Sequence, residues 1–309
     1  MNIGAPKSCT NFLARFVKVT SQETALFLLN ILFIGDVVGT DALGMLTRLL
    51  KTFTDKYHAD AVIVNGENVF EGKGINRKQA DELFAAGANI ITTGNHIWER
   101  WESRPLLREE RRILRPLNYP RNNGGAGFAI FETKSGQKVG VLSLQGRVFL
   151  PPIDDPFNAA DWALEHILRE TPIVIVDMHA EATAEKQAMG YYLDGRVSAV
   201  LGTHTHVQTA DERILPQGTA YISDVGMTGP YDSCVGMRTD IAIKRFTYGT
   251  PHKYETAKGD MKISGVCVEV DEATGRALRI ERILYPDFER QRTYVEDAGN
   301  HTEEGVPAK

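Results

Sequence analysis

LNILFIGD (residues 29–36), AVIVNGEN (61–68) and NIITTGNH (89–96) share one design, a short apolar run followed by glycine and then polar residues. Runs of this length that end at glycine and polar residues predict buried strands. Each strand would then deliver polar side chains at its carboxyl end.

Helical patterns separate these three runs. Between the first two, apolar residues recur three or four positions apart, at Leu43, Leu46, Leu50, Phe53 and Tyr57. Asn76 is placed to cap a second helix, which we expect to run to Ala86 and to end at Gly87. Strands that alternate with helices are typical of βαβ units, so the sequence predicts an α/β fold with a parallel core.

The rest of the chain predicts further strands and one more helix. Residues 98–120 mix charged, aromatic and proline residues, which predicts irregular structure with helical pieces. We expect strands at 127–131, 138–144, 172–177, 198–201 and 219–223, a helix at 158–169, and a hairpin formed by 261–270 and 276–283.

Composition narrows the class of protein. The 309 residues are 42% hydrophobic and 24% charged, as in ordinary globular proteins. The net charge of -5 gives no bulk attraction to nucleic acid or anionic lipid, so stable nucleic-acid binding is not indicated. No apolar run reaches the roughly 18 residues of a membrane span. Three dispersed cysteines, Cys9, Cys234 and Cys267, argue for a reducing compartment, so we expect a cytoplasmic protein.

The two ends of the chain differ from its centre. Residues 1–28 are basic, with no acidic residue before Glu23, and a transit or signal segment is one interpretation. They lack a clean apolar region with a cleavage site, which favours a simple N-terminal extension. We therefore predict an extension (1–28), one domain (29–286) and a polar C-terminal tail (287–309).

Polar side chains follow five of the predicted strands. In α/β sheets, ligands bind beyond the carboxyl ends of the strands, so we expect these side chains to meet there. Carboxylates, carboxamides and imidazoles together suit Mn, Fe or Zn, and the absence of cysteine argues against a structural zinc site. The residues are Asp36, Glu67, Asn68, Asn95, His96, His179, His204 and His206.

Each of these residues also has a structural interpretation. Asp36 could cap a helix or lie in a loop, Asn95 and His96 could form a turn, and His179 could be a buried core histidine. Glu67 is harder to explain in this way, because a desolvated carboxylate needs a partner. His204 and His206 would lie on one side of an extended chain. Taken together, the segments favour a metal site.

Five motifs carry a resemblance to a known family. GDVVG (35–39), NGEN (65–68), TTGNH (92–96), MHAEAT (178–183) and LGTHTHVQTADERILPQGTAYISDVGMTGPYDS (201–233) resemble the YmdB-like branch of the calcineurin-like metallophosphoesterases, over about residues 31–283. Most of that superfamily has a histidine where this chain has Val38, and a bridging aspartate where it has Glu67. In the YmdB-like branch, the asparagine that follows the glutamate takes the place of that histidine, and in this chain it is Asn68. These features count against a general protein phosphatase or an exonuclease.

The resemblance implies a fold and a metal centre. The fold would be a four-layer α/β/β/α sandwich of two mixed sheets flanked by helices. The centre would hold two ions, iron or manganese with zinc as an alternative. One ion would bind Asp36, Glu67, Asn68 and His206, the other would bind Glu67, Asn95, His179 and His204, and Glu67 would bridge them. His96 would be catalytic, not a ligand. Family members are cytoplasmic bacterial proteins, some of them homo-oligomers.

The resemblance also implies hydrolysis of cyclic nucleotides (2′,3′-cyclic or 3′,5′-cyclic) or related phosphodiesters. A hydroxide bridging the metals would attack phosphorus, and His96 would protonate the leaving group or stabilise its charge. No organic cofactor is needed. The alternatives are a phosphomonoesterase or nucleotidase, and a regulatory metal-binding protein with weak turnover. Residues 143–147, 227–233 and 249–258 are candidate pocket segments; the last could be a lid or an ordinary surface loop.

Overall fold

The computed structural model describes residues 28–287. The predicted extension and the predicted tail lie outside the described residues, apart from Leu28 and Asp287 at their borders. The division of the chain into these three parts therefore stays a prediction.

Eight strands form the first sheet, in the order β2-β12-β13-β1-β3-β4-β5, with β14 paired to β13. The neighbours β1, β3, β4 and β5 are parallel, whereas β13 is antiparallel to β1, so the sheet is mixed. The strands are β1 (Leu28–Ile34), β2 (Asp36–Val37), β3 (Ala61–Asn65), β4 (Ile90–Thr92), β5 (Ile113–Leu114), β12 (Met227–Pro230), β13 (Met261–Asp271) and β14 (Ala277–Tyr285).

Six strands form the second sheet, in the order β10-β11-β9-β8-β7-β6. Its centre is parallel and both of its edges are antiparallel, so this sheet is also mixed. The strands are β6 (Phe128–Glu132), β7 (Lys138–Gln145), β8 (Val174–His179), β9 (Ala199–Thr203), β10 (Arg213–Ile214) and β11 (Ala220–Ile222).

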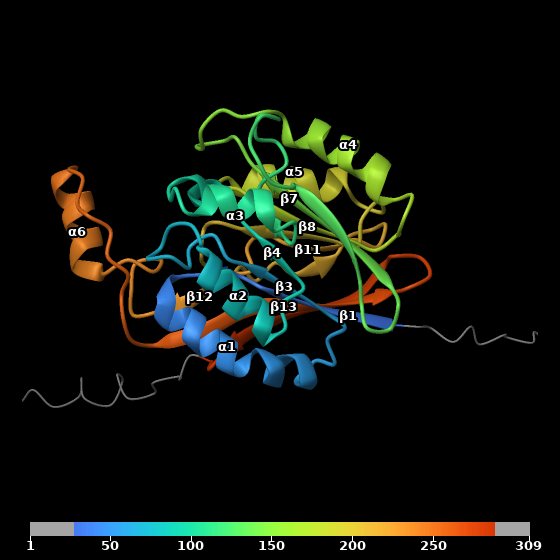
Figure 1. The fold of residues 1–309 in the computed structure, drawn as a ribbon, viewed down its shortest axis with the longest axis horizontal. Coiled ribbons are helices and arrows are strands. Elements are labelled where there is room, and N and C mark those ends of the chain that lie inside the picture. The colour runs from blue at the N-terminus through green and yellow to red at the C-terminus, as the bar shows by residue number, and fades with distance from the viewer. Residues whose placement is uncertain (1–27, 288–309) are drawn as a thin grey trace, which may run out of the picture.

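Helices cover the outer face of each sheet. The described helices are α1 (Gly39–Lys56), α2 (Arg77–Ala86), α3 (Ser103–Glu109), α4 (Pro156–Ile167), α5 (Thr183–Tyr192), α6 (Thr239–Tyr248) and the 3₁₀ helix η1 (Asn95–Trp98). Figure 1 shows the layers stacked from α1 and α2 at the bottom to α4 and α5 at the top.

Three buried apolar clusters hold the layers together. Leu46 of α1 and Leu83 of α2 belong to the cluster on the first sheet, and Leu164 of α4 belongs to the cluster on the second sheet. Between the sheets, Phe33 of β1 packs in one cluster with Ile175 of β8. Burial of these side chains removes apolar surface from water on both faces of both sheets. The four-layer α/β/β/α sandwich of two mixed sheets is thus confirmed.

Helix α2 follows its predicted bounds because its ends are encoded locally. The Asn76 side chain accepts from the Gln79 backbone, and the Gln79 side chain accepts from the Asn76 backbone, which completes a capping box. Gly87 ends the helix with φ at +116°, a conformation that glycine adopts without strain.

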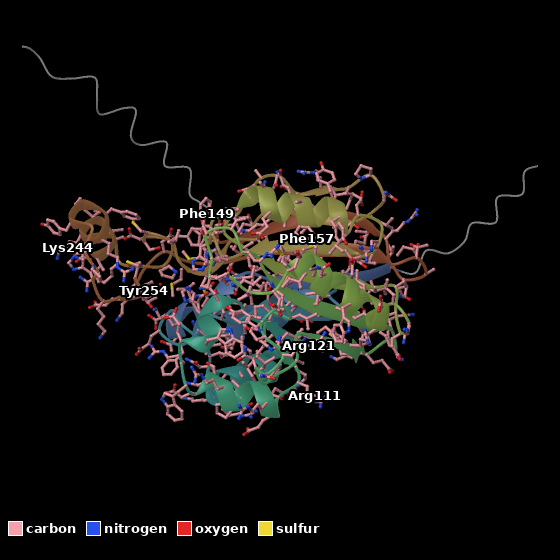
Figure 2. All side chains as sticks on the ribbon, turned by 90° about the horizontal axis from the view of Figure 1, so that it is seen from above. Arg111, Arg121, Phe149, Phe157, Lys244 and Tyr254 are labelled. Carbon is pink, nitrogen blue, oxygen red and sulfur yellow. The ribbon has the colours of Figure 1, made fainter. Side chains whose placement is uncertain are left out.

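Helices α5 and α6 were not predicted. Helix α6 buries only Ile241 and Ala242, so its apolar pattern is short. Lys244 marks α6 at the end of an arm that projects from the body, and Tyr254 lies closer to the body (Figure 2). The candidate lid segment, 249–258, follows this helix, and its role stays a prediction.

Within residues 28–287, every helix is too short or too polar to form a transmembrane span.

Candidate metal centre

The polar residues that follow the strands meet where the two sheets lie side by side. Asp36 follows β1, and Glu67 and Asn68 follow β3. Asn95 begins η1 just after β4, His179 ends β8, and His204 and His206 follow β9. The first sheet therefore supplies the oxygen ligands and the second sheet supplies the imidazoles. Direct contacts join six of the seven predicted ligands into one connected site, and Asn68 follows Glu67 in the chain.

His179 lies at the centre of one group of side chains. Its Nε2 atom is 2.9 Å from Asn95 Oδ1, 3.1 Å from His204 Nδ1 and 3.1 Å from Glu67 Oε1. The contact with Glu67 has an ion-pair distance but not the geometry of a hydrogen bond, since Glu67 Oε1 has no hydrogen-bond partner. Glu67, His179 and His204 offer ligand atoms that lie within 4.8 Å of one another.

In each of the two histidines, the ring nitrogen that faces away from the group already has a contact. The Thr203 hydroxyl donates to Asp177 Oδ1 at 2.7 Å, so it accepts from His179 Nδ1 at 2.9 Å. His204 Nε2 faces the Glu181 carboxylate at 3.1 Å. As between Glu67 and His179, the contact has an ion-pair distance but is not a hydrogen bond, and it places the His204 ring beside this carboxylate. The ring nitrogens that remain, His179 Nε2 and His204 Nδ1, point at each other and at two oxygen atoms.

The electrostatics of this group favour a positive charge at its centre. Burial opposes the charged form of His179, but the carboxylates of Glu67 and Asp36 raise its pKa to about 9. For His204, burial together with the charge of His179 lowers the pKa to about 3. Burial also opposes ionisation of Glu67, yet the neighbouring histidines hold its pKa well below its usual range. Glu67 and His204 are therefore in the forms that bind metals, an ionised carboxylate and a neutral imidazole, whereas the raised pKa of His179 shows that the carboxylates around it favour a positive charge at that position.

A second group surrounds Asp36. Asp36 Oδ1 is buried without a hydrogen-bond partner, and so is Oδ1 of Asn68, the residue that follows Glu67. The other atoms of these side chains are held in place, since Asp36 Oδ2 accepts from the His204 backbone at 3.2 Å and Asn68 Nδ2 donates to the Gly72 carbonyl at 2.9 Å. Unpaired buried acceptors are costly, and bound cations would satisfy them.

His206 completes the second group. Its Nδ1 atom lies 2.9 Å from the Val235 carbonyl, and because a carbonyl only accepts, Nδ1 carries the proton. The other nitrogen, Nε2, is 4.0 Å from Asp36 Oδ1. Burial raises the pKa of Asp36, as does the charge of Glu67, while His206 and His179 lower it. Glu67 thus interacts with both groups of side chains.

His96 lies beside the site with its side chain turned outward. Its backbone N–H donates to Glu67 Oε2 at 3.1 Å, which fixes the second oxygen of that carboxylate. Its Nδ1 atom contacts the Glu99 carboxylate, which also pairs with Lys73. The His96 side chain is 29% exposed. Within residues 28–287, no hydrogen bond engages its Nε2 atom.

Several supporting residues were not found by the sequence reasoning. Buried Asp177 accepts from Thr92 at 2.5 Å and from Asn65 at 3.0 Å, in addition to Thr203, and burial raises its pKa to about 6. Glu181 orients His204, and Glu99 orients His96. Most of these residues lie inside the motifs NGEN, TTGNH, MHAEAT and LGTHTH, so motif membership was the available signal.

Gly94 has a steric role at the site. A Cβ atom on this residue would lie 2.2 Å from the His179 ring, far closer than any van der Waals contact. The imidazole cannot move away without losing its bond to Thr203. Glycine at position 94 therefore lets the chain after β4 approach the central histidine.

A cavity of about 530 Å³ opens beside the site, and Asn95 lies in its wall. Trp98 and Tyr119 form an aromatic wall, with ring centroids 5.1 Å apart. Arg104 and Arg108 lie one turn apart on α3 and also line it. Neither guanidinium forms an ion pair within the described part of the chain. The cavity therefore offers aromatic surface and positive charge next to a predicted metal ligand.

Comparisons with known proteins agree with this arrangement. A family model described as YmdB-like protein matches residues 32–283. A 2′,3′-cyclic-nucleotide 2′-phosphodiesterase of Bacillus subtilis (strain 168) is 47% identical over 259 residues, which cover 84% of this chain and 98% of the relative.

Two solved structures are similar in fold and sequence. A hypothetical protein from Thermus thermophilus is 41% identical, with a TM-score of 0.77 over 83% of this chain and 99% of that chain. A structure described as a novel phosphatase from Mycoplasma pneumoniae is 36% identical, with a TM-score of 0.78 over 84% of this chain and 94% of that chain. The family match includes all seven of the proposed ligands, and the chain belongs to the YmdB-like family.

Proposed function

We propose that this protein is a metal-dependent phosphodiesterase that hydrolyses cyclic nucleotides, 2′,3′-cyclic or 3′,5′-cyclic, or related phosphodiesters. The Bacillus subtilis relative, which carries that activity in its name, supports the substrate class. The free cysteines Cys234 and Cys267 support a cytoplasmic location.

One observation carries the metal part of the proposal. Both sheets contribute acceptor atoms to the site. Other polar atoms of the same side chains are fixed by hydrogen bonds to Thr203, Gly72 and Val235. Such an arrangement suits a bound cation, because lone pairs that face one another repel unless a positive charge lies between them. We assign one ion to Asp36, Glu67, Asn68 and His206, and the other to Glu67, Asn95, His179 and His204, with Glu67 as the bridge.

The donor atoms limit which metal ions suit the site. Oxygen and imidazole nitrogen suit iron or manganese, with zinc as an alternative. When bound, two such ions would offset the charge of the phosphodiester and lower the pKa of a bound water from about 15.7 towards 7. Every other step must come from the side chains of the protein itself.

His96 is the proposed proton donor to the leaving group. Its backbone N–H donates to Glu67, its side chain is partly exposed, and its Nδ1 atom is held by Glu99. A carboxylate at Nδ1 fixes the ring orientation and leaves Nε2 as the atom that would pass a proton to a leaving oxygen. Glu99 is accordingly a positioning residue.

The adjacent cavity is the proposed site for the nucleoside part of the substrate. Its volume of about 530 Å³ lies in the range of about 300–1,000 Å³ typical of small-molecule sites. A base can stack on the wall formed by Trp98 and Tyr119. Arg104 and Arg108 would attract the anionic substrate towards the metal ions.

Hydrolysis of a substrate panel tests the proposal. Purified full-length protein with Mn²⁺ should hydrolyse a 2′,3′-cyclic or a 3′,5′-cyclic nucleotide faster than the corresponding monophosphate. A chelator should abolish the activity, and added Mn²⁺ should restore it. Faster hydrolysis of the monophosphate would assign a phosphomonoesterase instead, and no turnover of any substrate would favour a metal-binding regulator. Glu67→Gln is the matched inactive control.

A further inference from the structure

A second cavity lies away from the proposed metal ligands, between α4 and the loop that follows β5. Its volume is about 540 Å³, and Trp162, Ala159 and Leu117 supply its apolar surface. None of the seven proposed metal ligands lines it. The cavity is large enough for a mononucleotide-sized ligand, since small-molecule sites span about 300–1,000 Å³.

Arg115 is a buried cation in the wall of this cavity. Its side chain is only 6% exposed, and one guanidinium nitrogen donates to the carbonyls of Pro116 and Leu117 at 2.8 and 2.9 Å. Its Nε atom is buried without a hydrogen-bond partner. Within residues 28–287, no carboxylate forms an ion pair with it. Burial lowers its pKa, and no acidic group offsets that effect. A buried cation without a counter-charge is costly, and a bound anion would remove that cost.

The charged residues of the cavity wall offer two kinds of contact, guanidinium groups for an anion and a carboxylate for hydroxyl groups. Arg121 adds a second guanidinium beside Arg115, and it forms no ion pair within the described part of the chain. Of the two acidic residues, Asp155 is already engaged, because it caps α4 and pairs with Arg147 at 3.1 Å. The carboxylate of Asp154 has no such partner among the described residues, so it can accept hydrogen bonds from hydroxyl groups.

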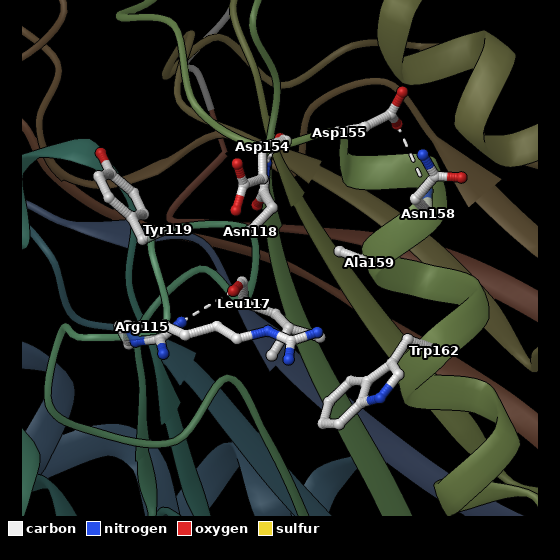
Figure 3. A pocket seen from close by; sticks show the side chains of 10 residues that line it. Arg115, Leu117, Asn118, Tyr119, Asp154, Asp155, Asn158, Ala159 and Trp162 are labelled. Carbon is white, nitrogen blue, oxygen red and sulfur yellow. Dashed lines mark hydrogen bonds between the residues drawn. The ribbon is translucent and has the colours of Figure 1, made fainter.

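Trp162 supplies a flat apolar surface. Its ring packs against His166, with centroids 4.5 Å apart, and against Phe128 at 6.0 Å, yet the residue remains 45% exposed. Figure 3 shows Trp162 and Asp154 on opposite sides of Leu117. Aromatic rings of this kind stack on nucleobases.

We propose that this cavity is a second ligand site that binds a nucleoside monophosphate. Arg115 and Arg121 hold its phosphate, Asp154 accepts from the ribose hydroxyls, and Trp162 stacks on the base. Carboxylates recognise ribose hydroxyls in other nucleotide sites by the same hydrogen bonds, and guanidinium groups suit phosphate. The site also touches the proposed substrate cavity, because Tyr119 lines both and its hydroxyl donates to Gln145 Oε1 at 2.8 Å.

Tryptophan fluorescence of the full-length metal-bound protein, titrated with AMP, tests this site without any turnover. AMP should quench the emission of the wild-type protein in a saturable manner, and Trp162→Leu should remove that quench. Arg115→Met should weaken AMP binding about tenfold or more, because a charge-assisted contact to phosphate is lost. Arg121→Met should weaken it in the same direction, and adenosine should bind at least about tenfold more weakly than AMP.

Trp101→Leu is the matched control, because Trp101 is 74% exposed and lies outside the cavity. It should leave the AMP quench unchanged, and hydrolysis of the cyclic substrate should continue in the Trp162 variant. The proposal is overturned if Trp162→Leu shows the full wild-type quench, or if Arg115→Met and Arg121→Met both bind AMP like the wild type. It is also overturned if Glu67→Gln abolishes the quench, because AMP would then occupy the metal centre. Absence of cyclic-nucleotide hydrolysis alone would count only against the proposed function.

Discussion

Glu67 and Asn68 are neighbours in the chain, but they should differ in importance. Glu67 contacts His179 and its charge also acts on Asp36, whereas Asn68 offers one buried oxygen without a partner. Glu67→Ala should therefore lose both ions, and Asn68→Ala should keep at least the ion assigned to His179 and His204. Elemental analysis of the two purified variants measures this. Equal metal retention would refute the bridging role of Glu67.

His96 should contribute to rate and not to metal binding. A general acid typically contributes about 10²–10⁴-fold, so His96→Gln should lower kcat for a cyclic nucleotide within that range while metal content stays unchanged. The loss should be smaller for a p-nitrophenyl ester, whose leaving group needs no proton. Steady-state kinetics with both substrates checks this. Loss of a metal ion from the variant would identify His96 as a ligand instead.

Gly94 should tolerate no side chain. The Cβ of Gly94→Ala would lie 2.2 Å from the His179 ring, so the variant should bind metal poorly or fold poorly. Gly44→Ala is the matched control, because its Cβ would meet only the end of the flexible Arg48 side chain, at 3.5 Å. That control should be neutral, or stabilising by about 0.5–1 kcal/mol, since it lies within α1. Thermal unfolding and metal content distinguish the two, and a normal metal content in Gly94→Ala would contradict the close approach.

At the scale of single elements, α2 illustrates how local sequence fixes a helix. Asn76→Ala would disrupt the capping box, and the free energy of unfolding should fall by about 0.5–2 kcal/mol. Lys78→Ala, at an exposed position of the same helix, should change it by less than about 0.5 kcal/mol. Urea unfolding measures both values. Equal stability of the two variants would show that the capping box contributes nothing.

The elements that the sequence predicted are those whose signals are local. The strands around Ile63 and Ile175 are continuous apolar runs, and α2 carries its own cap and stop. Helix α5 has no side-chain cap at Ala182, and α6 buries only two residues, so neither produced a clear pattern. Two-residue strands such as β5 exist only through their sheet partners, which sequence periodicity cannot show.

Local signals also explain which features of the candidate metal site could be predicted from the sequence. The candidate ligands follow strands and sit in recognisable motifs, so their clustering could be anticipated from the order of strands. The hydrogen bond from Thr203 to Asp177 and the contact between His204 and Glu181 join residues through the fold, and no spacing rule encodes them. The second cavity depends on Arg115 and Trp162, which are far apart in the sequence and belong to no motif.

At the scale of the whole molecule, the proposed metal centre lies between the two sheets. Asp36, Glu67 and Asn95 extend from the first sheet, and His179 and His204 extend from the second, so neither sheet alone holds a full ligand set. Ions bound there would link the two central layers. Ligands that bind only the folded chain stabilise it, and the stability of this protein should therefore depend on its metal content.

The metal content of the full-length protein is the most direct test of this account. Elemental analysis of protein purified without chelator and saturated with Mn²⁺ should give about two ions per chain, because two groups of acceptor atoms share Glu67. The same measurement on Glu67→Ala should give a value near zero. A single ion per chain under saturating metal, or two ions retained by Glu67→Ala, would contradict the two-ion centre.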